Sequence, residues 1–424
     1  MPLTAWQKLT FAYNRFMLDL VPPAHSRKPL TWSEIPSAFA YVVPYLFLAY
    51  LVRRRDTRTI RILLLPITAF LTIRGTFYYD FNSPDYVFYN WLRALLALTV
   101  LGKSIDFAFS KKGTFKIGET CLPAIHEDSS QSKDSHTHGG LLPSGFKDAL
   151  ETATTLRGIG WEMGKGVYIP PDNRPQERLA FLKATYFELI RYFLIMDVLV
   201  NIVQSVPGVG TPSGGTIFIP ELAPVPRYAF STLISIVAAT GMISGFHVLH
   251  HIGTLLGVGL MGDSPAAWPP ILNNSWSSDS ISDLWAKRWH QMLRRVFIVY
   301  GGIPGGWIAG RPGFVLGTFF ASALLHECSI WVIGRGLDHR VTFFFTFQGV
   351  CVILEVLWKK VTGYRVQGWG GRIWAYLIVL STGQACLDAW LVRGVGGTTF
   401  IPPFLSPTQM ILIPLFRRIL GINQ

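Results

Sequence analysis

Long apolar runs separated by short polar loops are the feature of this sequence that most constrains its fold. Runs of this character cover approximately residues 36–52, 60–79, 86–109, 179–206, 228–262, 296–310, 313–334, 341–358 and 373–393, with a shorter run at 405–421. A helix that crosses a bilayer needs about 20 mainly apolar residues. Since 228–262 is long and 296–310 is short and rich in glycine, we predict an all-α polytopic membrane protein with about 8 to 10 transmembrane helices.

The composition supports the same class. Half of the 424 residues are hydrophobic and only 15% are charged, whereas a soluble domain carries about 25% charged residues. The net charge is +13, from 38 Lys and Arg against 25 Asp and Glu. Most of these basic residues lie in short loops between the apolar runs, which is the pattern of the positive-inside rule and not of a nucleic-acid-binding surface. We therefore expect a surrounding membrane lipid and no nucleic-acid partner.

The basic loops also predict the orientation of the chain. Arginines follow the first apolar run and lysines follow the third, which places both loops, including residues 110–178, in the cytosol. The loops at 80–85 and 207–226 contain no Lys or Arg and are predicted to be lumenal. The basic residues at 359–372 fit this alternation only if one segment between 296 and 358 is re-entrant.

Residues 1–30 form a separate N-terminal region. They lack the uninterrupted apolar core and the cleavage site of a signal peptide. We interpret them as an interfacial segment, whose Trp6, Phe11, Phe16 and Leu20 can enter the headgroup region.

The loop at 110–178 contains a Ser-, His- and Asp-rich stretch. Its His126, His136 and His138 suggest either metal binding or a plain surface loop. No helical pattern or cysteine pair fixes such ligands, and the four cysteines of the chain are far apart. We therefore favour a surface loop and predict no metal site.

The segment 278–296, SDSISDLWAKRWHQMLRRV, begins with Ser and Asp residues that favour a helix N-terminus. It contains no Pro or Gly, so the sequence predicts one continuous helix, with Trp285 and Trp289 on one face and His290 beside them. Two interpretations fit its other, basic side: an interfacial helix held by anionic headgroups, or a helix that binds a phosphate-rich ligand. The basic and polar residues concerned are Lys287, Arg288, Gln291, Arg294 and Arg295.

His326 and Glu327 interrupt an otherwise apolar run at 319–336. Ionisable residues at membrane depth are costly, so they are candidates for function. A neutral histidine can accept a proton from a hydroxyl near neutral pH. The alternative is a buried histidine that bonds to a neighbouring helix, and the residue type alone does not separate the two interpretations.

A second pair of histidines, His247 and His251, has the i, i+4 spacing of helical metal ligands. Val248 excludes an HExxH motif and no acidic residue lies in that turn, so we favour ordinary polar contacts within the membrane. Glu188 and Arg191 are spaced to form an ion pair, and further ionisable residues in apolar runs are Asp197, Glu355 and Asp388.

Several of these segments resemble the wax-synthase-type branch of the membrane-bound O-acyltransferases. Residues 280–291, SISDLWAKRWHQ, are similar to the branch motif SLxxFWGRRWHQ, and residues 322–327, SALLHE, to the motif SxLLHE that follows it within a span. Two more blocks resemble the fungal members, RGIGWEMGKGVYIPP at 157–171 and AWPPILNNSW at 267–276. The four blocks occur in order over roughly residues 150–335.

The resemblance implies an integral membrane enzyme, expected in the endoplasmic reticulum, whose helices surround a central catalytic tunnel. It implies that His326 is the general base and that His290 is the second polar residue of the active site. Trp289 and Glu327 are candidates for support, with His290 or Trp289 stabilising the oxyanion. The chain departs from the family motif at residues 284–287, and the family often carries Asn at the position of His290.

The resemblance also implies an acyl-CoA co-substrate and no metal. CoA carries several phosphate charges, and residues 267–335 are expected to form the catalytic core of a single domain over 1–424. The candidates for binding CoA are Lys287, Arg288, Gln291, Arg294, Arg295 and Arg157, with Lys165 as a further cation.

The choice of substrate is the remaining question. Fungal members of the branch frequently acetylate terpenoid or meroterpenoid alcohols, so we expect acetyl-CoA as donor and a hydrophobic natural-product alcohol as acceptor, in secondary-metabolite biosynthesis. The alternatives are synthesis of long-chain wax esters or sterol esters and, from another class, a lipid or solute transporter, since transporters also contain intramembrane His, Asp and Glu. The identity of the alcohol and the oligomeric state are left open.

Overall fold

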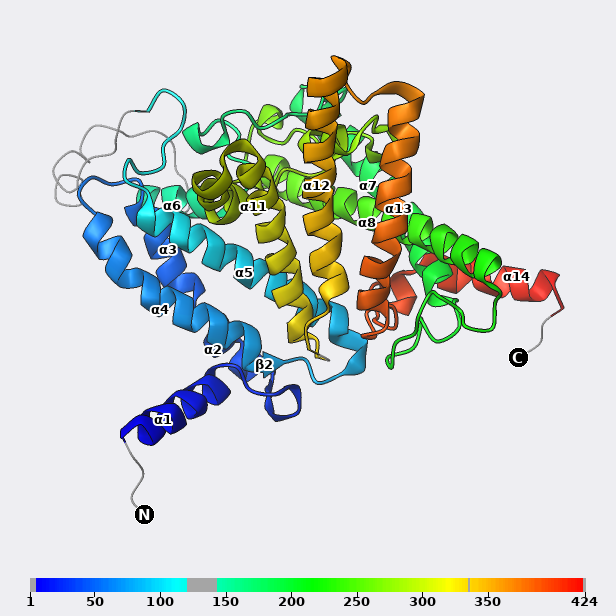
Figure 1. The fold of residues 1–424 in the computed structure, drawn as a ribbon, viewed down its shortest axis with the longest axis horizontal. Helices are drawn as coiled ribbons and strands as arrows, with labels where there is room; N and C mark the ends of the chain where they lie inside the picture. The colour runs from blue at the N-terminus through cyan, green and yellow to red at the C-terminus, as the bar shows by residue number, and fades with distance from the viewer. Residues whose placement is uncertain (1–4, 120–142, 335, 422–424) are drawn as a thin grey trace. The chain divides into compact units, whose positions relative to one another are not determined.

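The computed structural model describes residues 5–119, 143–334 and 336–421 (Figure 1). These residues are largely helical, and their only strands, β1 (Lys28–Pro29) and β2 (Tyr79–Asp80), form one short parallel pair. The predicted all-α class is therefore confirmed. The histidine-rich stretch that contains the three loop histidines lies outside the described residues.

Five segments of the described chain are long and apolar enough to cross a membrane. They are Trp32–Leu51, Arg58–Phe77, Pro224–Gly259, Arg294–Val332 and His339–Thr362. The predicted class of multi-pass membrane protein is thus confirmed. Three further predicted spans are also helices but fall outside this set of five, namely α5 (Val87–Phe109), α7 (Arg178–Gln204) and α13 (Gly368–Leu391). The total of 8 to 10 spans stays a prediction.

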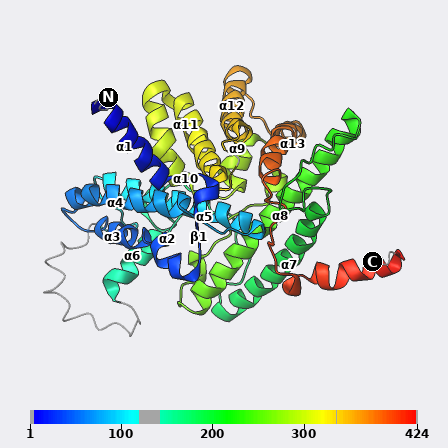
Figure 2. The same ribbon diagram turned by 90° about the horizontal axis from the view of Figure 1, so that it is seen from below.

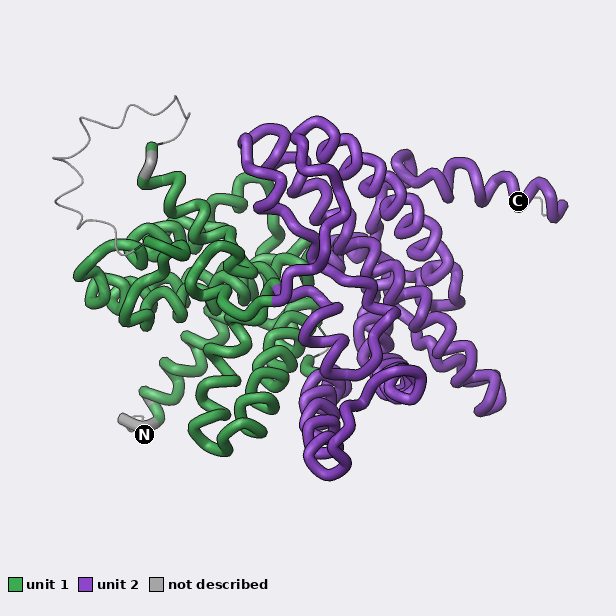
Figure 3. The backbone as a smooth tube through the Cα atoms, turned by 90° about the horizontal axis from the view of Figure 1, so that it is seen from above, with its two compact units in different colours: residues 1–82, 89–167, 292–337 green, residues 83–88, 168–291, 338–424 purple. Residues whose placement is uncertain are grey.

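The chain divides into two compact units, each assembled from separate stretches of sequence (Figure 3). Unit 1 contains residues 1–82, 89–167 and 292–337. Its elements besides β1, β2 and most of α5 are α1 (Ala5–Leu20), η1 (Ala24–Ser26), η2 (Trp32–Glu34), α2 (Ile35–Ala38), α3 (Val42–Leu51), α4 (Arg58–Phe77), α6 (Ser144–Thr154), η4 (Glu162–Gly164), α10 (Arg294–Phe297), the π-helical η8 (Ile298–Gly302) and α11 (Ile303–Val332).

Unit 2 contains residues 83–88, 168–291 and 338–424. Besides α7 and α13, its elements are η3 (Pro84–Tyr86), α8 (Pro224–Gly259), η5 (Pro265–Ala267), η6 (Ser275–Ser277), α9 (Ile281–Asp283), the π-helical η7 (Leu284–Arg288), α12 (His339–Thr362), η9 (Pro403–Leu405), the π-helical η10 (Thr408–Leu412) and α14 (Ile413–Ile419). The boundary between the units therefore falls inside the region 267–335 that the sequence predicts as the catalytic core.

The N-terminal helix α1 exposes several large apolar side chains. Phe11 is 64% exposed and Phe16 is 50% exposed. Apolar surface of this kind in a short terminal helix fits the predicted interfacial segment, because a headgroup layer would cover it. That interfacial location stays a prediction.

Buried arginines hold unit 1 together between its helices. Arg53 is almost fully buried and forms ion pairs with Glu119 (2.6 Å) and Asp148 (3.1 Å). Arg93 donates to the backbone carbonyls of Thr76 (3.1 Å) and Tyr79 (2.6 Å) at the end of α4. The basic loops that predict orientation therefore also supply structural contacts.

In unit 2, α7 and α8 run side by side in opposite directions (Figure 2). Contacts pair Leu182 with Gly259, Met196 with Gly245 and Leu199 with Gly241, so the sequence order is reversed along the interface. Small residues on α8 permit this close approach. The predicted ion pair between Glu188 and Arg191 is confirmed at 2.7 Å on the exposed side of α7.

The chain reverses direction inside the segment Arg294–Val332. Ala309 and Gly310 are not helical, and Gly310 has a φ of +61° that favours glycine. A Cβ atom on Gly301 would lie 1.8 Å from the Gly317 carbonyl oxygen, and one on Gly305 would lie 2.1 Å from the Gly313 carbonyl oxygen. The two arms therefore form a helical hairpin at backbone contact, and the predicted separation of 296–310 from 313–334 is confirmed.

We predict that Gly305→Ala destabilises this hairpin far more than Gly306→Ala. A Cβ atom at Gly306 would have its nearest neighbour at 3.6 Å, whereas one at Gly305 would overlap a backbone oxygen. Both changes gain the same helix propensity, so their difference isolates the helix contact. We expect Gly305→Ala to lose about 1 to 3 kcal/mol of stability, seen as a lower melting temperature of the detergent-purified protein. Equal melting temperatures for the two variants would contradict the proposed backbone contact.

Candidate active site

The predicted continuous helix over 278–296 is wrong. The structure contains one turn of α-helix in α9, five π-helical residues in η7, a non-helical stretch at 289–293 and then α10. The Trp289 amide bonds to the Leu284 carbonyl (2.8 Å) and not to that of Trp285. The Trp285 carbonyl accepts from the Gln291 side chain instead (2.7 Å). Gln291 is therefore a structural residue that ends the helix, and the predicted common helical faces do not extend beyond Arg288.

The predicted N-terminal cap of this segment is confirmed, and a second cap comes from a distant helix. The Ser280 hydroxyl accepts from the Asp283 amide at 3.0 Å. The Glu355 carboxylate of α12 accepts from the Ile281 amide (2.7 Å) and the Ser282 amide (2.9 Å). It also accepts from the Trp374 ring nitrogen of α13 at 3.0 Å. A buried carboxylate in the membrane is thereby satisfied by the first amides of a helix, whose dipole favours negative charge.

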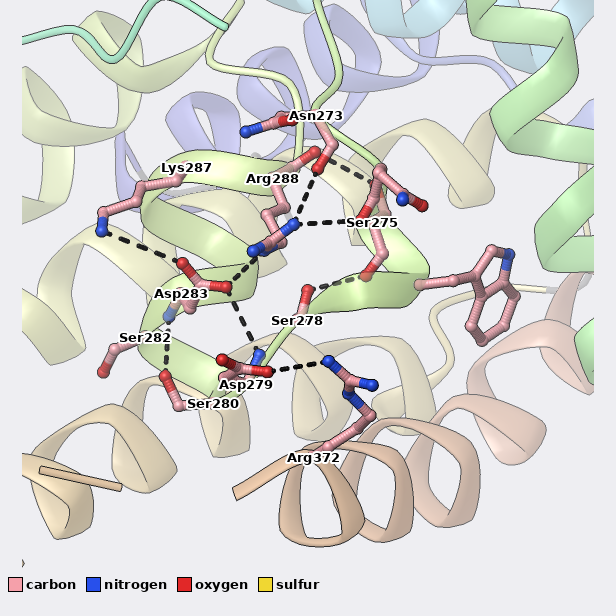
Figure 4. A network of polar contacts seen from close by, with 12 residues as sticks. Asn273, Ser275, Ser278, Asp279, Ser280, Ser282, Asp283, Lys287, Arg288 and Arg372 are labelled. Atoms are coloured by element: carbon pink, nitrogen blue, oxygen red, sulfur yellow. Dashed lines mark hydrogen bonds and ion pairs between the residues drawn. The ribbon is translucent and has the colours of Figure 1, made fainter. Parts of the chain in front are cut away.

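A network of polar contacts surrounds the start of this segment (Figure 4). The Arg288 guanidinium bonds to the Asp283 carboxylate and reaches the carbonyl of Asn273 at 3.4 Å. Asp279 pairs with Arg372 of α13 at 3.1 Å. The Lys287 ammonium is 3.9 Å from Asp283, and the Lys287 side chain is 57% exposed. Arg288 thus stabilises the loop at Asn273 through its hydrogen bonds, whereas the Lys287 side chain is exposed and only loosely paired.

Aromatic rings collect around Trp289 and His290. Trp289 meets Trp285 edge to face at 5.8 Å, and Trp285 donates to Gln348 of α12 at 3.2 Å. Phe246 of α8 lies 4.8 Å from the His290 ring and 5.9 Å from the Trp289 ring. Unit 2 therefore holds His290 in an aromatic environment built from α8, η7 and α12.

The two further sequence blocks that resemble the family, residues 157–171 and 267–276, contact one another in unit 2. The Asn273 amide donates to the Tyr168 hydroxyl at 2.8 Å. Arg174 bonds to the Trp268 carbonyl at 2.7 Å and pairs with Asp172 at 2.6 Å. The Trp268 ring rests on α8, where a Cβ atom at Gly257 would lie 2.3 Å from it. These contacts hold in place the chain that precedes residues 281–293, which we call the Trp289 segment.

His326 lies on α11 in unit 1. Its Nδ1 is 2.8 Å from the Ser322 carbonyl oxygen. Because a carbonyl only accepts, Nδ1 must carry the proton, and in a neutral ring the lone pair is then on Nε2. Glu327 is buried beside it, and the Ser329 hydroxyl donates to the His326 carbonyl at 2.7 Å. The local backbone therefore selects the tautomer that offers Nε2 as a base.

The other predicted cations of unit 1 have different surroundings. Arg295 forms a two-pronged ion pair with Asp106 (2.9 and 2.8 Å). Burial lowers the pKa of Arg157 to about 10, and Lys165 pairs with Glu162 at 2.5 Å. Among the described residues, Arg294 has no ion-pair partner. Arg294 is thus less committed to a protein partner than Arg295.

The predicted site residues fall into two groups. Unit 1 holds His326, Glu327, Arg294, Arg295 and Arg157, and unit 2 holds Trp289, His290, Lys287, Arg288 and Gln291. Their assembly into one active site stays a prediction. Sequence reasoning identified Glu355 only as an ionisable residue in an apolar run and assigned no role to it. It missed Phe246 altogether, since an aromatic residue in an apolar run is ordinary.

The fold defines an all-α membrane protein, and comparisons with known proteins show which family a part of the chain is similar to. Residues 268–347 match the sequence model described as the membrane bound O-acyl transferase family. This stretch includes the Trp289 segment and His326. The predicted resemblance to the wax-synthase-type branch of that family is therefore confirmed.

The chain is similar to curated proteins of two kinds. Acetyltransferase aurG of Calcarisporium arbuscula is 30% identical over 144 residues, which are 30% of this chain and 35% of that protein. Acetyltransferase ple2 of Rhodocybe pseudopiperita is 22% identical over 274 residues, covering 61% and 70%. Probable long-chain-alcohol O-fatty-acyltransferase 9 of Arabidopsis thaliana is 29% identical over 152 residues, covering 33% and 41%. Apart from ple2, this chain spans only about two fifths or less of the length of these relatives.

We predict that Glu355→Gln destabilises the protein more than Glu188→Gln. The amide side chain would place an NH₂ group against backbone donors that the carboxylate now satisfies, and an unmet buried donor costs about 1 to 3 kcal/mol. Glu188 forms an exposed pair, whose loss costs at most about 1 kcal/mol. Melting temperatures of the two purified variants measure the difference. A Glu355→Gln variant as stable as Glu188→Gln would show that the cap is dispensable.

Proposed function

We propose that this protein is an integral membrane acyltransferase of the endoplasmic reticulum that moves an acetyl group from acetyl-CoA to a hydroxyl of a hydrophobic alcohol. The observation that carries the proposal is the hydrogen bond between His326 Nδ1 and the Ser322 carbonyl, which leaves Nε2 as the base in the matched family region. The similarity to acetyltransferases and to long-chain-alcohol acyltransferases supports an alcohol acceptor.

In this proposal, His326 activates the acceptor. A hydroxyl is a poor nucleophile, so Nε2 accepts its proton while the oxygen attacks the thioester carbonyl carbon. The new carbon–oxygen bond forms a tetrahedral intermediate. As the carbon–sulfur bond breaks, the imidazolium returns the proton to the CoA thiolate. The products are the ester and CoA, and no acyl-enzyme is required.

The developing oxyanion requires a hydrogen-bond donor. We assign this role to His290, with Trp289 as the alternative. The aromatic contacts of His290 with Phe246 and Trp289 support the assignment, because they restrict the orientation of its ring. Glu327 supports the base from within α11 in this proposal, as a buried neighbour of His326.

For the CoA phosphates, we favour Lys287 and Arg294 over Arg288 and Arg295. Arg288 and Arg295 each bond to a carboxylate, which lowers their capacity to bind another anion. Lys287 is exposed and only loosely paired. Arg157 is a further candidate, because its guanidinium stays cationic at neutral pH even with the pKa that burial lowers to about 10.

The acceptor and the acyl chain are proposed by analogy, since a fold does not fix a substrate. The similarity to two proteins named as acetyltransferases favours acetyl transfer. The terpenoid or meroterpenoid alcohol is proposed from the sequence resemblance to fungal members of the branch. A second candidate function is synthesis of long-chain esters, which the similarity to the plant long-chain-alcohol acyltransferases supports.

We predict that His326→Ala lowers ester formation by at least about 100-fold, because a general base contributes roughly that much or more. The purified protein is given acetyl-CoA or palmitoyl-CoA with a panel of farnesol, ergosterol and hexadecanol, and ester is measured by mass spectrometry. His339→Ala, at an exposed histidine at the start of α12, is the matched control and is expected to retain wild-type turnover.

The same assay can contradict each part of the proposal separately. Near-normal turnover by a folded His326→Ala variant would remove the assigned base. A wild-type preference for palmitoyl-CoA would replace acetyl transfer with the long-chain alternative. A wild-type protein that forms ester from neither donor would remove the acyltransferase function.

A separate prediction concerns the phosphates of CoA. We expect Lys287→Gln to raise the KM for acetyl-CoA about threefold, the size expected for loss of a solvent-exposed ion pair, and to leave the KM for the alcohol unchanged. The effect should shrink at high ionic strength, since salt screens exposed charges. Lys359→Gln, at an exposed lysine of α12, is the matched control. An unchanged KM for acetyl-CoA would exclude Lys287 from phosphate binding.

A further inference from the structure

The function proposed above leaves one unusual group in unit 2 without a role. His251 on α8 is buried, with 6% of its surface exposed, and neither of its ring nitrogens has a hydrogen-bond partner among the described residues. A buried polar group without a partner lowers the stability of the fold, and such groups are uncommon in native proteins. His251 therefore requires an explanation that packing alone does not provide.

The neighbours of His251 are flat rings. Tyr192 of α7 lies 5.9 Å from the His251 ring, His247 lies 5.8 Å away and His250 lies 5.6 Å away. Tyr192 stacks directly on His247, at 4.0 Å and with an interplanar angle of 8°. These contacts orient the ring of His251 but use neither of its nitrogens.

Nearby charged groups are already paired. Arg174 bonds to Asp172, and Arg191 bonds to Glu188. The described His, Cys, Asp and Glu residues form no group of three that could hold a metal ion. The described neighbours therefore indicate neither a charged partner nor a metal for His251. A neutral polar ligand fits, because a neutral imidazole offers one donor and one acceptor.

His251 is also close in sequence to residues that contact the predicted site. Phe246, just over one helical turn earlier on α8, touches the His290 ring at 4.8 Å. His250 lies 6.2 Å from Trp268, in the matched family region. The ring contacts from His251 through His250 to Trp268 therefore connect His251 with the matched family region, all within unit 2.

We propose that His251 is a substrate-binding residue, one of whose ring nitrogens hydrogen-bonds a neutral polar group of the substrate, such as the hydroxyl of an alcohol. The inference rests on the proposed acyltransferase function. The amide groups of the pantetheine arm of acyl-CoA have the same chemistry, and separate KM measurements for the two substrates distinguish these sources. The flat aromatic rings of Tyr192, His247 and His250 beside His251 favour the hydrophobic alcohol.

The test compares His251→Phe with wild type, using acetyl-CoA and whichever of farnesol, ergosterol and hexadecanol the wild type esterifies fastest. Phe keeps the ring contacts and removes both nitrogens. We expect the KM for the alcohol to rise about tenfold, the size of the one hydrogen bond that the substrate loses. The KM for acetyl-CoA should stay unchanged, and the melting temperature should not fall. His251→Gln, which retains a donor and an acceptor, should restore most of the affinity.

The matched control is Thr254→Val on the same helix. Thr254 is fully buried, but its hydroxyl bonds to the His250 carbonyl at 2.8 Å, so it has nothing to offer a substrate. Its substitution should leave both KM values unchanged. If His251→Phe does not fold, His251→Leu provides the same comparison.

The outcomes separate this inference from the function on which it rests. A raised KM for the alcohol supports it, and a raised KM for acetyl-CoA alone supports the same chemistry with pantetheine as the ligand. Unchanged KM values in an active His251→Phe variant overturn it and make His251 a structural residue. A wild-type protein without ester formation would instead reject the acyltransferase function.

Discussion

In unit 2 the arrangement of helices depends on carboxylates buried within apolar segments, each of which must find donors inside the protein because a bilayer offers none. Glu355 accepts the first amides of α9. Asp197 of α7 accepts the Thr408 amide (2.8 Å) at the start of η10. Asp388 of α13 accepts the Ile217 amide (2.9 Å) in the loop before α8. In each case a carboxylate that is costly to bury connects a distant segment to a long helix.

The need to satisfy buried polar groups explains why the Trp289 segment stops being helical after Arg288, although its composition favours a helix. Glu355 fixes the start of α9, and Arg288 bonds to Asp283 so that the first turns stay in place. Gln291 then takes the Trp285 carbonyl that a further helical turn would need. The chain turns away after Arg288, and His290 packs against Phe246. The position of His290 thus follows from polar groups that are satisfied at both ends of a short helical segment.

The sequence predicts the helices well because each apolar run of suitable length has one satisfactory backbone structure in lipid. It also predicts a helix N-terminus capped by Ser or Asp at the start of 278–296, and the separation of the run 296–310 from 313–334. It fails at 289–293, because local rules assign a helix wherever Pro and Gly are absent and do not register competition from the Gln291 side chain. The cap from Glu355 joins residues 74 positions apart, and no local pattern reveals such a pairing. The sequence identified Glu355 only as an ionisable residue in an apolar run.

The two histidines central to the proposals differ in a way that bears on specificity. His326 takes its tautomer from the Ser322 carbonyl, a backbone group that any residue at that position would supply. In the proposed mechanism, the tautomer of the base is therefore independent of which alcohol or acyl chain is bound. His251 receives no such bond from its own helix, so its hydrogen bonding depends on what is placed beside it. If both proposals hold, substitutions in α7 and α8 change the acceptor while His326 on α11 stays the same. Such a division is expected on chemical grounds, since the reaction needs one fixed base whereas recognition requires a surface that can vary.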